Sequence, residues 1–144
     1  MQTYAELSDQ RAFTRSTIPA SRLQVLAGRA LSGFVGLFLL FDGTVKLVQP
    51  QAVVDISQQL GYSGDTIFGI GVVLLALLVI YLIPQTATLG ALLLTAYLGG
   101  AVATHVRVGS SLFSVLFPTF VAAFIWGGLL LRKPSLRVLL PFRA

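Results

Sequence analysis

The chain has 144 residues, of which 56% are hydrophobic and 10% are charged, and its formal net charge is +5. Soluble domains carry about 25% charged residues, so this composition excludes an ordinary water-soluble domain of the same length. The basic residues flank hydrophobic segments and form no stripe, so we expect no nucleic-acid partner.

Residue types that carry redox or metal chemistry are scarce in this sequence. The chain has no cysteine, which excludes thiolate ligands, disulfides and covalent haem attachment, and its single histidine is His105. The sequence contains no phosphate-binding loop, no metal-ligand spacing and no nucleophile elbow. We therefore expect no metal and no covalently bound cofactor, and whether the chain is an enzyme stays open.

The chain begins with a polar segment of mixed charge at residues 1–22. This segment lacks the apolar run of a signal peptide, and we expect a cytoplasmic tail. The first apolar segment covers residues 23–48 and is interrupted by charges at Arg29, Asp42 and Lys46. Because three more hydrophobic segments follow and no cleavage site does, we interpret it as an uncleaved first membrane-spanning helix.

The connection that follows, residues 49–65, contains a helical pattern of its own. Its apolar residues recur at i, i+3 and i+7, at Val53, Ile56 and Leu60. This spacing predicts a short amphipathic helix at the membrane interface, ended by Gly61. Asp65 is predicted to be the N-cap of the second span.

The remaining spans are predicted at residues 66–83, 86–106 and 112–131. Only a tight turn at Pro84 and Gln85 separates the second from the third, so these two must be antiparallel neighbours. At 1.5 Å per residue the fourth span matches a hydrocarbon core of about 30 Å. Backbone groups in lipid must be satisfied internally, so we predict an all-α, four-transmembrane-helix bundle at 23–134, followed by a short basic cytoplasmic tail at 135–144.

The distribution of the ten Lys and Arg residues predicts the orientation of the bundle. Lys46 and Arg107 lie in or beside the two connections on one side of the membrane. The other basic residues precede the first span or follow the fourth, at Arg11, Arg15, Arg22, Arg29, Arg132, Lys133, Arg137 and Arg143. Because Lys and Arg are enriched on the cytoplasmic side, we expect both termini to be cytoplasmic.

Four ionisable residues are candidates for a binding site at the outward end of the bundle. Asp42 and Lys46 are spaced i, i+4, so they share a helix face and can pair. The third span brings His105 and Arg107 to the same level, where such a cluster could bind an anion, hold a quinone head group or relay a proton. The alternatives are a self-neutralising ion pair and an interfacial histidine. On a helical wheel His105 and Arg107 point in different directions.

Small residues form stripes on the first and third spans. Gly36 and Gly43 lie on one stripe of the first span, and Gly99 and Gly100 belong to a run of small residues in the third. Small residues let helix backbones approach closely in a membrane, so these four glycines are predicted to serve helix packing.

Five strings occur in the order GLFLLFDGTVKLVQPQAVVD, QLGY, YLIPQTATLGALLLTAYLGGAVATHVRVG, LFPTF and WGGLLLR. Over residues 33–134 the chain therefore resembles the DoxX-like family of small bacterial four-helix membrane proteins. The stretch TAYLGGAVATHVRVG is the most distinctive part. The resemblance implies a multi-pass protein of the bacterial inner membrane.

For function, the resemblance implies two roles. The first is a membrane subunit or anchor of a quinone-linked oxidoreductase system, with quinone as a non-covalent ligand. The second is a non-enzymatic assembly or chaperone-type partner that packs through its small-residue helix faces. The expected partners are the lipid bilayer and other membrane or redox proteins, and an oligomer is compatible with either role.

Overall fold

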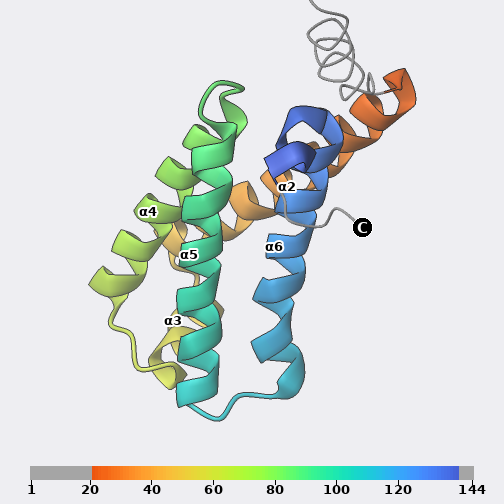
Figure 1. Cartoon of the computed structure of the whole chain (residues 1–144). Helices are drawn as coiled ribbons and strands as arrows, with labels where there is room; N and C mark the ends of the chain where they lie inside the picture. The colour runs from red at the N-terminus through yellow and green to blue at the C-terminus, as the bar shows by residue number, and fades with distance from the viewer. Residues whose placement is uncertain (1–20, 140–144) are drawn as a thin grey trace, which may run out of the picture.

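The computed structural model describes residues 21–139, and every regular element in that range is a helix (Figure 1). Four helices are long and apolar enough to cross a membrane: α2 (Arg22–Val48), α4 (Gly64–Leu82), α5 (Ala87–Arg107) and α6 (Leu112–Arg132). A short helix, α3 (Gln51–Gln59), connects α2 to α4, and a 3-10 helix, η1 (Pro134–Leu139), follows α6. These elements confirm the predicted all-α bundle of four spans with a short helix between the first two.

The four long helices form a closed ring in chain order. Helix α2 packs against α4 and α6, and α5 packs against the same two helices, so α2 and α5 lie diagonally across the bundle. In Figure 1, α5 lies between α4 and α6. Most of the predicted polar tail at 1–22 and the last part of the predicted basic tail at 135–144 lie outside the described residues.

Local sequence signals explain where the helices begin and end. Ser21 and Gln24 form a capping box at the start of α2, in which each side chain accepts a hydrogen bond from the backbone of the other. Gly61 has a φ of +83° directly after the α3 cap, as expected for a helix stop. The prediction that Asp65 caps α4 is wrong. The cap is Ser63, whose hydroxyl accepts from the Thr66 amide, and Asp65 lies in the first helical turn.

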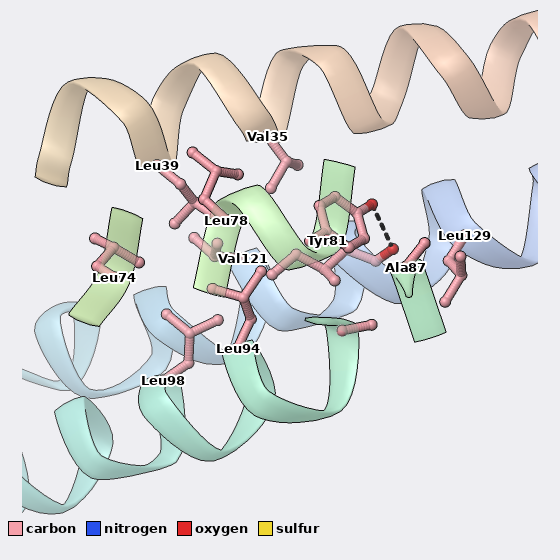
Figure 2. Close-up of a cluster of buried hydrophobic side chains, with 12 residues drawn as sticks. Val35, Leu39, Leu74, Leu78, Tyr81, Ala87, Leu94, Leu98, Val121 and Leu129 are labelled. Carbon is pink, nitrogen blue, oxygen red and sulfur yellow. Dashed lines mark hydrogen bonds between the residues drawn. The ribbon is translucent and has the colours of Figure 1, made fainter. Parts of the chain in front are cut away.

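The core fills the centre of the ring with side chains from all four long helices. Its largest fully buried members are Tyr81, Leu39, Leu74, Leu94, Ile125 and Leu129, several of which are shown in Figure 2. Tyr81 brings a polar group into this apolar centre, and its hydroxyl donates to Ser32 Oγ at 3.0 Å and to the Ile125 carbonyl oxygen at 3.2 Å. These bonds connect α4 to both α2 and α6 and satisfy the buried hydroxyl.

The four glycines predicted to serve packing have different surroundings. A Cβ placed on Gly43 would lie 2.6 Å from Leu75 Cδ2, and one on Gly36 would lie 3.5 Å from Leu82 Cδ2. Both positions on α2 therefore face α4. A Cβ on Gly99 or Gly100 would meet no atom of the described residues within 4 Å.

The outward surface of the ring is apolar. Large hydrophobic side chains remain at least two-fifths exposed on all four long helices, among them Phe34, Leu37, Phe41, Val72, Leu92, Phe113, Phe120 and Phe124. A monomeric soluble protein rarely exposes an apolar surface of this extent. Lipid acyl chains are the environment that such a surface fits.

Candidate functional site

A chamber of about 480 Å³ lies inside the bundle, at the end next to α3. Small-molecule sites commonly enclose about 300–1,000 Å³. All four long helices contribute to the wall, and most of that wall is apolar, with Phe38 and Leu39 from α2, Ile70 from α4 and Val121 from α6. The chamber is therefore large enough for a small organic molecule, and its mostly apolar wall suits an apolar molecule.

Helix α2 supplies an ion pair to the chamber wall. Lys46 Nζ donates to Asp42 Oδ1 at 2.5 Å, and the two side chains are 23% and 37% exposed. The i, i+4 spacing places both groups on one face of α2, which lowers the free-energy cost of holding either charge at this depth. Because the charges cancel, the pair adds polarity to the chamber without adding net charge.

Helix α5 supplies Tyr97, Thr104 and His105 to the opposite wall. His105 Nδ1 lies 3.0 Å from Ser110 Oγ, so Nε2 is the ring nitrogen left for a ligand. Within the described residues, the Tyr97 hydroxyl has no hydrogen-bond partner. Two polar groups of α5 are thus available at the chamber wall for a bound molecule.

The segment from α3 to Ser63, which we call the strap, closes the chamber at the end of the bundle. Ser57 and Leu60 of the strap line the chamber, and so does Tyr62, whose hydroxyl lies 2.6 Å from Thr104 Oγ1. Arg107 Nη2 donates to the Leu60 carbonyl oxygen at 3.0 Å. Two hydrogen bonds from the last turns of α5 therefore hold the strap in place.

Three of the four candidate residues come together, and the fourth does not. Asp42, Lys46 and His105 line the chamber, whereas Arg107 is absent from its wall and bonds to the strap. Two residues along an α-helix correspond to a rotation of about 200°, which points Arg107 away from His105. In the structure, Arg107 instead bonds to Leu60 and helps to hold the strap in place.

Four polar residues of the chamber are not among the site residues predicted from the sequence: Ser57, Tyr62, Tyr97 and Thr104. A helical signal existed for two of them, because Tyr97 and Thr104 are spaced i, i+7 and share a face of α5. The other two belong to the strap, and only its position over the helix ends brings them to the chamber. Their contribution depends on tertiary structure that no local pattern encodes.

The chamber combines an apolar wall with a small set of hydrogen-bonding groups. The Tyr97 hydroxyl is a donor, and His105 can donate or accept depending on its tautomer. The neutralised pair of Asp42 and Lys46 lies on the facing helix. This arrangement suits an uncharged ring that carries carbonyl or hydroxyl groups better than it suits a free ion.

Comparison with known proteins gives one family match. A family model described as the DoxX-like family matches residues 30–128, which include every residue that lines the chamber. The comparisons with curated proteins and with solved structures give no significant match.

Proposed function

This chain belongs to the DoxX-like family, and from that premise we propose that it is a membrane subunit that binds a quinone head group in the chamber, in association with an oxidoreductase system. A quinone has an apolar ring and two carbonyl oxygens that accept hydrogen bonds. The free Tyr97 hydroxyl and His105 Nε2 in a largely apolar chamber are the observation that carries this proposal.

The electron chemistry in this proposal belongs to the quinone and to a partner protein. The sequence has no cysteine and a single histidine, so the chain supplies few ligands for a redox centre of its own. A protein that holds an organic cofactor contributes binding, orientation and local electrostatics. Tyr97 and His105 would orient the head group, and the ion pair of Asp42 and Lys46 would polarise the opposite side.

Purification from the native host in mild detergent tests the proposal. Mass spectrometry of the organic extract is expected to find quinone with the wild-type protein, and His105→Ala or Tyr97→Phe should each retain about tenfold less, the factor given by one hydrogen bond of about 1.4 kcal/mol. Gly33→Ala is the matched control, because a Cβ there meets no described atom within 4 Å and the position is outside the chamber. A folded wild-type protein without quinone, or unchanged retention in both chamber variants, would contradict the proposal.

An assembly or anchoring role is the second candidate function. It is supported by Gly99, which is exposed, lies outside the chamber and has open space around it in the described part of the chain. Small residues on an outward helix face allow another membrane helix to approach closely. If the same purification yields a protein complex without quinone, and Gly99→Leu dissociates that complex, this role replaces quinone binding.

We propose further that both termini face the cytoplasm of a bacterial cell and that the strap faces outward, as the flanking basic residues favour. The native chain has no cysteine, so a single introduced thiol reports one position. In spheroplasts, a membrane-impermeant maleimide is expected to label Gln58→Cys on α3, and to label Ser135→Cys only after permeabilisation. Both positions are exposed. Labelling of Ser135→Cys alone before permeabilisation would reverse the orientation.

A further inference from the structure

We propose that the ligand enters the chamber sideways from the bilayer, between α4 and α5, and that Gly100 keeps this route open. The inference rests on the proposed function, because it concerns a molecule that occupies the chamber. It also defines the substrate class as a lipid-dissolved amphiphile whose apolar tail stays among the acyl chains while its polar ring lies in the chamber.

The strap closes the end of the chamber that faces α3 and the water outside the membrane. Ser57 is 8% exposed, and it lines this end of the chamber together with Leu60. The strap is held on α5 by the bond between Tyr62 and Thr104 and by the bond from Arg107. A molecule arriving from water at this end would have to break both contacts.

The seam between α4 and α5 is closed at one end and open at the other. A Cβ on Gly90 would lie 2.4 Å from the backbone nitrogen and Cα of Tyr81, so the two helix backbones touch near their connection. Nearer α3, Gly100 faces about 80° away from Gly90 on the α5 surface, and a Cβ there would meet no described atom within 4 Å. Figure 1 shows the same divergence, with α4 and α5 adjacent at the connection and apart toward α3.

Gly100 lies where this seam reaches the chamber. It lines the chamber and is exposed on the bundle surface, and the same is true of Ala96 one turn away. Ile70 of α4 also lines the chamber, and Tyr97 and Thr104 border Gly100 on the face of α5. Two small residues exposed both to the chamber and to the bundle surface mark a lateral opening.

Side-chain contacts close other seams of the ring. Phe38 of α2 and Phe117 of α6 meet edge to face at the chamber, with ring centroids 5.6 Å apart. Between α2 and α4, Leu75 fills the space next to Gly43. The α5–α6 seam is tied toward its other end by a hydrogen bond from Trp126 to Thr95. Beside Gly100, the contact that bridges α5 to the chain next to α4 is the Tyr62–Thr104 hydrogen bond, one turn nearer the strap, and a Cβ on Gly100 itself would meet no described atom within 4 Å.

The route can be tested with a photoactivatable azidobenzoquinone that carries a decyl tail. Purified protein in lipid nanodiscs is mixed with the probe, photolysed at set times, and crosslinks to chamber peptides are quantified by mass spectrometry. Gly100→Phe is expected to slow the approach to that variant's own final yield by at least about tenfold relative to the wild type, the factor that a barrier of about 1.4 kcal/mol imposes. Gly69→Phe is the control, because Gly69 is exposed on α4 and outside the chamber, and a Cβ there meets no described atom within 4 Å.

Ala96→Phe places the same bulk at the opening and replaces Gly100→Phe if that variant does not elute as a folded protein. Equal rates for the opening variants and Gly69→Phe would overturn the lateral route while leaving the proposed function intact. A lost final yield would also overturn it, because the added ring would then occupy the binding position itself. Faster labelling in Arg107→Ala, without an effect at the opening, would place entry at the strap. A wild-type protein that acquires no crosslink would overturn both proposals.

Discussion

Gly90→Ala is expected to destabilise the bundle by at least about 3 kcal/mol, through overpacking and the loss of a buried hydrogen bond. The added methyl group would lie 2.4 Å from Tyr81 N and Cα, and 2.8 Å from the Ile80 carbonyl carbon. These are backbone atoms, so no rotamer change relieves the clash and α4 must move. That movement would pull the Tyr81 hydroxyl from Ser32 and Ile125.

The turn between α4 and α5 leaves little room for such a shift. Thr86 Oγ1 donates to the Ile80 carbonyl oxygen at 2.8 Å, and the Gly90 amide donates to the Thr86 carbonyl oxygen at 2.8 Å. Alanine is favoured over glycine inside a helix by about 1 kcal/mol, which is too little to offset the clash. The packing clash therefore decides that Gly90→Ala lowers the stability of the bundle.

Thermal unfolding in detergent, followed by circular dichroism and by size-exclusion chromatography, measures this effect. Gly33→Ala is the matched control, because a methyl group on Gly33 meets no described atom within 4 Å and should leave stability unchanged or slightly higher. A Gly90→Ala protein that unfolds at the same temperature as the control would show that α4 and α5 do not touch at Tyr81.

The helices were predictable from sequence because local chemistry sets their limits. Predicted spans at 66–83 and 86–106 correspond to α4 and α5 with shifts of one or two residues, since the hydrophobic runs end at Pro84 and near Arg107. The predicted cap of α4 is wrong because serine and aspartate both serve as N-caps. Which of the two residues caps α4 depends on the path of the strap, and the structure places Ser63 at the cap position.

The chamber was only partly predictable, because it results from how the helices diverge. Helical spacing placed Asp42, Lys46 and His105 at one level, and the structure brings them to one chamber. No sequence pattern distinguishes Gly99 from Gly100, although only Gly100 lines the chamber. Tyr97 lies within the run of small residues predicted to serve packing, and only the tertiary structure places it at the chamber wall.

The second large effect is expected at the ion pair on α2. Asp42→Ala leaves the Lys46 ammonium group without its partner beside an apolar wall. Breaking a fully buried pair costs about 3–5 kcal/mol, and partial exposure of Lys46 at 23% reduces the expected loss to about 1–2 kcal/mol. Removing both charges in Asp42→Ala/Lys46→Ala leaves no unpaired group, so the double variant should be more stable than Asp42→Ala.

The double variant also separates the two interpretations of this pair, because it removes the charges while leaving α2 able to fold. Unfolding of the wild type, both single variants and the double variant gives the coupling free energy of the pair, and quinone extraction from the same four proteins gives its contribution to binding. If the double variant folds and loses quinone, the pair contacts the head group from the wall opposite Tyr97 and His105. If it folds and retains quinone like the wild type, Asp42 and Lys46 only neutralise each other, and binding must depend on the polar groups of α5.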